Sequence, residues 1–431
     1  MNIRWFSPLD ADKTEIGRYS QSILPYLHKE FALHVVTDSA TEHYDFESPH
    51  SVLGMAPVNI YNLGNSYLHI GILKLAMAQP GVVVLHDVSL LELGLAYARD
   101  AGDVCLRTIA GNEYGAEAAL AFDALYDSER YDWRGTSQQQ YDDFVNRYPL
   151  FRTFMGNPMG VVVHSDYALQ RLQRKYSGPI ARLDLPYAAP PGGAPLRVFE
   201  PPFQMVFCGH AGPNRRLQQF IDAWSRISHP QLFRLKLFGN IDKAQEILAL
   251  ADRSGLGGLV EVVGFVSETA LDEAIAQAHI AINLRNPTMG EASASQLRYW
   301  SRGVPSLVSD VGWYAELPDD VVVKISPERE QEDIIAALEE FAAGNSACFE
   351  CGSKGYDYLL EKHNIARYIK SLHGFVEKVS EARFVAAVFD DRLVPMMASM
   401  CDDVNDSGMF EATLGRLSGM VESLEKGQFN Q

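Results

Sequence analysis

The chain has 431 residues, of which 47% are hydrophobic and 21% are charged; this is a globular composition, and the length suits two α/β domains. The formal net charge of −18 argues against a nucleic-acid binder, because such proteins carry a basic face. It argues less strongly against tight binding to an anionic membrane, since a local basic patch could still exist.

Along the first half, short apolar runs alternate with helical patterns. The run 81–85 has the sequence GVVVL, and such continuous apolar character is typical of a strand buried on both faces. Strands separated by helices predict βαβ units and a parallel sheet. The predicted strands cover residues 2–6, 34–37, 58–61, 81–85 and 160–163, and the predicted helices cover residues 14–29, 67–78 and 167–175.

Two segments interrupt this alternation. The polar, aromatic stretch 100–148 is too long for a plain strand-to-helix connection, and we predict a helical insertion over a cleft. The run 186–202 is dense in proline and glycine, which remove backbone donors and helix continuity. We therefore expect a first domain over residues 1–186 and a linker over residues 187–202.

The second half starts a new alternating series, which predicts a second domain over residues 203–360. Ser326 and Pro327 are suited to open a helix, and the pattern over 356–380 is strongly helical. We expect residues 361–431 to form C-terminal helices that pack back on the first domain, and the tail 381–431 has no assigned role. The predicted strands cover residues 204–208, 234–238, 260–263, 280–283, 306–308 and 321–324.

The predicted fold class is therefore α/β, with two Rossmann-like, doubly wound domains that face a central cleft. In such sheets a ligand binds at the carboxyl ends of the strands. That geometry suits one substrate on each side of the cleft.

The most informative stretch is 283–317. A predicted strand ends at Asn283, and Glu291 precedes a run of small residues that opens a helix. Small residues at a helix start let backbone N–H groups approach a phosphate closely, and the helix dipole favours the anion. The carboxylate of Glu291 could accept hydrogen bonds from sugar hydroxyls.

This stretch resembles the nucleotide-sugar site of the retaining enzymes of glycosyltransferase family 4, which have the GT-B fold. The family commonly shows a glutamate, seven residues, a second glutamate and then Gly-x-Pro. Here Gly303-Val304-Pro305 occupies the last position. Counting back, the second glutamate is replaced by Arg298, and the first falls at Gly290, beside Glu291. The resemblance implies contact of Glu291 with the donor sugar, while the ribose-binding role passes to another residue or is absent.

A second stretch, 205–217, is similar to the family segment that cradles the diphosphate. A predicted strand leads into Gly209, which permits close backbone approach, and Arg215 and Arg216 follow where a cation is expected. A guanidinium suits phosphate because its planar fork donates two parallel hydrogen bonds.

Weaker likenesses extend over residues 1–375. The loop 12–20 around Gly17 looks like the family's acceptor-side glycine loop, His86 and Asp87 end a strand where related enzymes place a histidine near the reacting sugar, and Phe265 lies in a segment that flanks the base. The residues implied are catalytic His86 and Glu291; donor-binding Gly209, Arg215, Arg216, Phe265, Gly290, Ala292, Ser293, Ala294 and Ser295; and acceptor-side Gly17 and Asp87.

Each candidate also has a structural interpretation. His86 could be a buried structural histidine, as we favour for His164, and Asp87 could cap the following helix. Glu291 could be a first-turn acid that the helix dipole favours. Arg298 could line the site or lie on a solvated helix face, and we favour the solvated face.

The resemblance implies a retaining hexosyltransferase that moves a sugar from UDP- or GDP-sugar to a glycan or lipid-linked acceptor, in polysaccharide biosynthesis. No metal or other cofactor is expected, because cations and a helix start can stabilise the leaving diphosphate. The alternatives are a GT-B epimerase or hydrolase and a non-catalytic nucleotide-sugar-binding protein, which the replaced glutamate favours. We expect no nucleic-acid partner, and peripheral membrane association stays open.

Cysteine usage and the first residues bear on location. Five cysteines do not suggest a disulfide framework, and the pair Cys348 and Cys351 lacks a second pair that would complete a zinc set. The N-terminus has no basic region followed by an apolar one, and no run reaches about 18 apolar residues. We expect a cytoplasmic protein without a signal peptide or a membrane-spanning helix.

Overall fold

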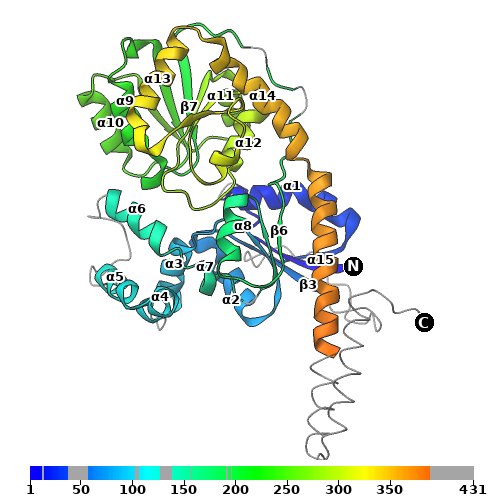
Figure 1. Cartoon of the computed structure of the whole chain (residues 1–431). Helices are drawn as coiled ribbons and strands as arrows, with labels where there is room; N and C mark the ends of the chain where they lie inside the picture. Colours follow the sequence, from blue (N-terminus) through cyan, green and yellow to red (C-terminus); the bar gives the residue numbers. More distant parts are fainter. Residues whose placement is uncertain are drawn as a thin grey trace, which may run out of the picture. The chain divides into compact units, whose positions relative to one another are not determined.

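The structure is a computed structural model and describes residues 1–11, 14–36, 57–101, 106–126, 138–156, 158–190, 193–195 and 197–388. The chain divides into two compact units, residues 1–376 and 377–431. Two parallel six-stranded sheets with alternating helices lie in the first unit (Figure 1). Of the predicted tail, residues 389–431 lie outside the described residues, as do residues 12 and 13 of the glycine loop.

The first sheet has the strand order β2-β1-β3-β4-β5-β6, and every neighbouring pair is parallel. The five strands predicted here are confirmed to within two residues at each end, because each is an apolar run with clear turn signals. The short sixth strand, Ile180–Arg182, was not predicted from the sequence. The strands are β1 (Asn2–Phe6), β2 (Ala32–Val36), β3 (Val58–Leu63), β4 (Gly81–Leu85), β5 (Pro158–Val163) and β6 (Ile180–Arg182).

The helices of the first domain begin where local chemistry allows. Thr14 precedes α1, and its side chain accepts a hydrogen bond from the amide of Ile16. The described residues of the stretch 100–148 are mainly helical, and residues 102–105 and 127–137 of this stretch lie outside the described residues. The helices are α1 (Glu15–Glu30), η1 (Tyr67–His69), α2 (Ile70–Ala78), α3 (Leu91–Ala101), α4 (Leu106–Tyr114), α5 (Ala116–Tyr126), α6 (Gln138–Arg147), α7 (Phe151–Phe154) and α8 (Asp166–Gln173).

The second sheet has the order β12-β11-β10-β7-β8-β9, again parallel throughout. The chain runs outward from β7 to β9 and then returns to the other side of β7, so the sheet is doubly wound. The strands are β7 (Phe203–Cys208), β8 (Phe233–Phe238), β9 (Val260–Gly264), β10 (Ile280–Asn283), β11 (Ser306–Ser309) and β12 (Val323–Ile325).

Helices cover both faces of this second sheet. In Figure 1, α9, α10 and α13 lie on one side of β7, and α11 and α12 lie on the other. Trp224, Phe220 and Phe341 are fully buried in the core beneath α9 and α13. The helices are η2 (Pro213–Arg215), α9 (Leu217–Trp224), η3 (Pro230–Leu232), α10 (Ala244–Arg253), α11 (Glu268–Gln277), α12 (Ala294–Ser301), η4 (Gly312–Glu316), η5 (Pro327–Arg329) and α13 (Glu330–Ala342).

The linker is tied to the second domain by Arg197. Its guanidinium donates to the carbonyl oxygens of Ala278 at 2.6 Å, Arg302 at 2.7 Å and Gly303 at 2.7 Å. These carbonyls follow the ends of α11 and α12, where backbone acceptors lack helical partners. Arg197 therefore closes two helix ends at once and fixes the path of the linker.

The chain returns to the first domain at His363. The helical prediction over 356–380 is confirmed except at residues 363 and 364, where α14 (Ser346–Lys362) has ended and α15 (Ile365–Val388) has not yet begun. His363 is buried; its Nδ1 lies 2.7 Å from the carbonyl oxygen of Leu185, and its own carbonyl accepts from the amide of Tyr187 at 2.9 Å. Asn364 then caps the new helix by accepting from the amide of Arg367. The two crossing segments are thus hydrogen-bonded to each other.

Candidate functional site

The second sheet has its topological switch point between β7 and β10, where the chain leaves β7 in one direction and β10 in the other. Arg215, which follows β7, and Asn283, which ends β10, meet there. Arg215 is 4% exposed, its Nη2 donates to Asn283 Oδ1 at 3.0 Å, and its guanidinium lies 4.8 Å from the ring centre of Phe207. The fold thus brings a buried cation to the carboxyl edge of the sheet.

Asn283 connects this cation to the start of α12. Its amide Nδ2 donates to Ser293 Oγ at 3.3 Å and to Gln296 Oε1 at 3.0 Å, and Ser295 Oγ donates to Asn283 Oδ1 at 3.3 Å. Ser293 is the N-cap residue, and its hydroxyl accepts from the amide of Gln296. Ser293 and Ser295 are buried, whereas Ala292 and Ala294 between and before them are partly exposed.

Arg215 carries a positive charge that the described residues do not balance. No carboxylate in that part of the chain lies within ion-pair distance of it, and its Nε has no hydrogen-bond partner there. Burial, and then the neighbouring Arg285, lower the pKa of Arg215 to about 10, so the group stays charged at neutral pH. A buried cation in this state is stabilised by an anion.

Arg216, unlike Arg215, has carboxylate partners for its side chain. Its backbone is left-handed, with φ of 57°, and its side chain turns to Glu330, to which Nη2 donates at 2.7 Å and Nε at 3.0 Å. Asp142 of α6 lies 3.5 Å from its Nη1. The structure therefore separates the two predicted phosphate ligands, since one has an unbalanced charge and the other is held in an ion pair.

Glu291 lies in the loop before α12, together with Arg285. Its carboxylate accepts from the Nη1 of Arg285 and, at 3.3 Å, from the hydroxyl of Thr288, and the residue is 7% exposed. Burial opposes the charged form of Arg285, but Glu291 and Tyr314 outweigh it and raise its pKa. The carboxylate of Glu291 is thus oriented by a cation.

Gly290 lies at a contact between the two domains. Its φ is 82°, and a Cβ there would overlap the side chain of Val88 from the first domain. The amides of Val88 and Ser89 both donate to the carbonyl oxygen of Met289, at 2.8 and 2.9 Å. The loop after β4 is therefore seated directly on the loop that carries Glu291.

Asp87 comes from that same loop of the first domain. Its Oδ2 accepts from the amide of Asn65 at 2.8 Å. Burial and then the charge of Glu291 raise the pKa of Asp87 to about 7. The two carboxyl groups, one from each domain, thus influence each other across the junction.

His86 is buried beside Asn62, whose Oδ1 lies 3.3 Å from its Nε2. The rings of Tyr19 and His164 lie 4.9 and 5.0 Å away, centre to centre. Burial, and then the charges of His164 and His69, hold the pKa of His86 well below its usual value. His86 is therefore neutral at physiological pH, and a neutral imidazole accepts or donates a hydrogen bond without adding charge.

Three further predicted residues lie after a strand or in a helix. Gly209 follows β7 with φ of 119°, a conformation that glycine adopts without strain. Phe265 follows β9 and is 76% exposed. Gly17 lies in α1, where a Cβ would come within 2.6 Å of the carbonyl oxygen of Asp10.

The expectation for Arg298 is wrong, because it does not lie on a solvated face. Its side chain is 5% exposed and is bound by Asp272 and Glu268 of α11: its Nε donates to Asp272 Oδ1 at 2.8 Å, and its Nη2 donates to Glu268 Oε2 at 2.7 Å. Helix α12 is buried from Ser295 to Ser301, so it has no solvated face there.

Sequence reasoning missed Asn283 and Arg285 as site residues. Both carry a readable signal: Asn283 is a polar end to the apolar strand IAIN, and Arg285 is a strand-end cation two residues later. Polar side chains at the carboxyl end of a parallel strand face the ligand crevice.

None of the helices in the described part of the chain is long and apolar enough to cross a bilayer. Over the same residues, no three His, Cys, Asp or Glu side chains are grouped so that they could hold a metal ion.

Comparisons with known proteins reveal likeness in structure alone. No family model and no curated protein matches the sequence. A sucrose-phosphate synthase from Thermosynechococcus elongatus superposes with a TM-score of 0.59 at 12% identity, covering 89% of this chain and 100% of that one. WaaG, a glycosyltransferase involved in lipopolysaccharide biosynthesis, gives a TM-score of 0.51 at 15% identity, covering 87% and 99%. With its two parallel sheets, the chain has the two-domain α/β fold called GT-B.

Proposed function

We propose that the protein is a retaining glycosyltransferase that moves a hexose from a UDP- or GDP-sugar to a hydroxyl of a glycan or lipid-linked acceptor. The observation that supports this most is the unbalanced positive charge of Arg215 beside the start of α12. A diphosphate supplies the anion that such a site lacks, and a helix start adds N–H donors and a favourable dipole.

In this proposal, Arg215 and the backbone around Ala292 and Ala294 hold the donor diphosphate. Glu291, oriented by Arg285, accepts hydrogen bonds from the hydroxyls of the donor sugar. The bond between the anomeric carbon and the diphosphate oxygen breaks, the acceptor oxygen attacks from the same face, and its proton passes to the leaving diphosphate. Stabilising that leaving group is the main task of the protein.

Groups of the first domain stand on the acceptor side in this proposal. Asp87 lies across the junction from Glu291, and the neutral His86 lies next to it in the chain. Neither has to take a proton in the step described, because the diphosphate does so. We expect them to orient the acceptor hydroxyl and to add no charge beside the developing positive sugar. Gly17 and Phe265 are assigned to the acceptor side and to the donor base.

The proposal includes transfer without a metal, because Arg215 and the helix start supply the positive potential. It further assigns the protein to polysaccharide biosynthesis in the cytoplasm, with peripheral membrane association to reach a lipid-linked acceptor.

The first test measures thermal stability with UDP, GDP and their sugars, with and without EDTA. Stabilisation by one nucleotide series that EDTA does not remove supports the donor site, and no response to any of them contradicts it. The second test follows nucleoside diphosphate release with candidate acceptors and reads the anomeric configuration of the product by NMR. Inversion at the anomeric carbon contradicts the retaining mechanism.

A non-catalytic nucleotide-sugar-binding protein is the second candidate. Arg298 favours it, because this residue is buried in ion pairs where the resemblance would place a ribose-binding glutamate. Stabilisation by a nucleotide sugar, without nucleoside diphosphate release over a range of acceptors, is the result that separates this candidate from a transferase; an unchanged nucleotide sugar after incubation separates it from an epimerase.

A further inference from the structure

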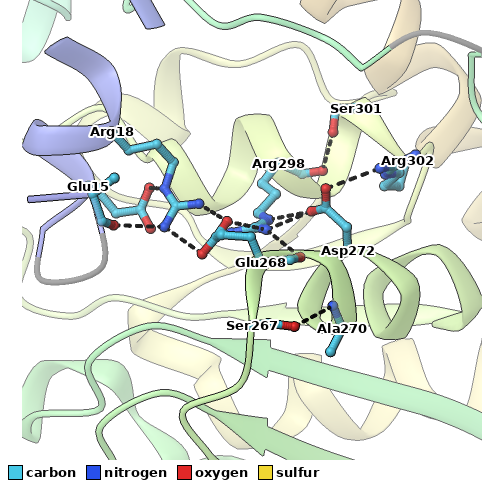
Figure 2. A network of polar contacts seen from close by, with 10 residues as sticks. Glu15, Arg18, Ser267, Glu268, Ala270, Asp272, Arg298, Ser301 and Arg302 are labelled. Atoms are coloured by element: carbon cyan, nitrogen blue, oxygen red, sulfur yellow. Dashed lines mark hydrogen bonds and ion pairs between the residues drawn. The ribbon is translucent and has the colours of Figure 1, made fainter. Parts of the chain in front are cut away.

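A network of ion pairs outside the candidate donor site connects α1 of the first domain to α11 and α12 of the second (Figure 2). Glu268 stands at its centre. Both of its carboxylate oxygens are engaged by Arg18: Oε2 by Nη1, and Oε1 by Nη2 at 2.7 Å. This is a two-pronged contact, the geometry in which an arginine and a carboxylate interact most strongly.

Glu268 is already fixed from its own domain before Arg18 reaches it. The Nη2 of Arg298 donates to Glu268 Oε2 at 2.7 Å, and Arg298 is itself held by Asp272. Arg302 also donates to Asp272, at 3.1 Å. Because the arginine behind it is buried and doubly bound, the Glu268 carboxylate is held in place at the surface of the second domain, and little side-chain entropy is lost when Arg18 binds.

Arg18 is likewise oriented by its own domain. Its Nη2 donates to the carbonyl oxygen of Ala11 at 2.9 Å, and its Nε lies 3.4 Å from Glu15. The side chains of Arg18 and Glu268 are 26% and 45% exposed. Each domain thus presents one oriented, solvent-accessible partner to the other.

Two other contacts between these parts of the chain are buried and uncharged, whereas the partly exposed carboxylate of Glu316 accepts from the amides of Asp166 and Tyr167 at the start of α8. The hydroxyls of Tyr19 and Tyr368 are 2.6 Å apart inside the protein, and the bond between His363 and Leu185 is buried too. Buried neutral contacts respond weakly to salt, whereas an exposed ion pair is screened. The exposed pair of Arg18 and Glu268 is therefore a contact between the domains that water and ions can release.

We propose that Arg18 and Glu268 form a reversible latch that holds the two domains closed, with Arg298 as the residue that positions the carboxylate. This inference does not depend on the proposed function. It predicts that breaking the latch loosens domain contacts that Arg18 and Glu268 do not touch.

The test measures hydrogen exchange of the backbone amides of Val88 and Ser89, which donate to Met289 across the junction. The full-length protein is compared with Arg18→Gln and Glu268→Gln. Both variants should exchange these two amides about two- to fivefold faster, which matches the strength of an exposed ion pair. Raising the salt from about 0.05 M to about 0.5 M should move the unmodified protein toward the variants, and should change the variants less.

Arg147→Gln is the matched control, because Arg147 pairs with Glu117 at 3.0 Å on the surface of the insertion, within one domain. It should leave the exchange of Val88 and Ser89 unchanged. Arg18→Lys keeps the positive charge but lacks the planar guanidinium, so its exchange rates at Val88 and Ser89 should lie between those of the unmodified protein and of Arg18→Gln. Unchanged exchange at Val88 and Ser89 in both Arg18→Gln and Glu268→Gln overturns the latch.

Discussion

Arg215 and Arg216 are adjacent in sequence and opposite in environment, and glutamine at each position gives a matched pair of variants. Arg215 has no carboxylate partner among the described residues, whereas Arg216 is bound to Glu330. If Arg215 binds an anion and Arg216 stabilises the fold, the first substitution must lower the affinity for the donor and the second must lower the free energy of unfolding.

For Arg215→Gln, the loss is one charge-assisted contact to the diphosphate, about 1.5–3 kcal/mol. That corresponds to a donor Kd that rises by roughly 10- to 150-fold. The free energy of unfolding should not fall by a comparable amount, because no buried carboxylate is left behind. For Arg216→Gln, Glu330 stays 8% exposed and without its partner, and breaking such a buried pair costs about 3–5 kcal/mol of stability.

The assays are chemical denaturation for stability and calorimetric titration with UDP and GDP for affinity, both on the full-length protein. We expect opposite effects: Arg215→Gln lowers the nucleotide affinity and leaves the free energy of unfolding nearly unchanged, whereas Arg216→Gln mainly lowers the free energy of unfolding. If Arg215→Gln binds the nucleotide as well as the unmodified protein, or if it unfolds as easily as Arg216→Gln, the assignment of Arg215 is refuted.

Three other substitutions test features of the fold and the junction. Gly290→Ala should destabilise the protein by about 1–3 kcal/mol in thermal denaturation, because a side chain there is strained and overlaps Val88; an unchanged melting temperature would show that the two loops are not in contact. Asp87 has a folded-state pKa of about 7, above its unfolded value, so its protonation favours the folded state at low pH and this contribution is lost as pH rises through 7. Asp87→Asn should therefore be more stable than the unmodified protein at pH 8, with a difference that shrinks towards pH 5, and a pH-independent difference would contradict the raised pKa. Arg197→Met should lower the free energy of unfolding by at least about 2 kcal/mol, since several helix-end carbonyls lose a charged donor; a smaller loss in chemical denaturation would mean that water replaces the guanidinium.

The strands were the most predictable part of the molecule. GVVVL at 81–85 and IAIN at 280–283 were predicted with the bounds they have in the structure, because an apolar run between turn signals determines a buried strand by itself. The helix predicted over 14–29 is found as α1 at Glu15–Glu30, one residue later at each end. A difference of this size is the usual uncertainty of a helix terminus.

The partners of the polar residues could not be predicted. Arg215 and Asn283 are 68 positions apart, and Arg298 and Asp272 are 26 apart, so no local pattern connects them. Arg298 was assigned to a solvated helix face, whereas α12 packs against α14 and β10 and its residues from Ser295 to Ser301 are buried. The break at His363 is accompanied by hydrogen bonds to Leu185 and Tyr187, at the end of the first domain and the start of the linker, and these too are formed only in the folded chain.

The contact between Tyr19 and Tyr368 has a consequence for how the protein is made. The first domain is completed by a helix that leaves the ribosome about 180 residues after residue 186, which at bacterial-to-eukaryotic elongation speeds means a delay of roughly 10–40 s. During that interval the nascent first domain exposes the tyrosine and histidine rings that α15 later covers. Shortened versions of the gene that stop before residue 365 should therefore yield an aggregation-prone product, even though both sheets are encoded in full.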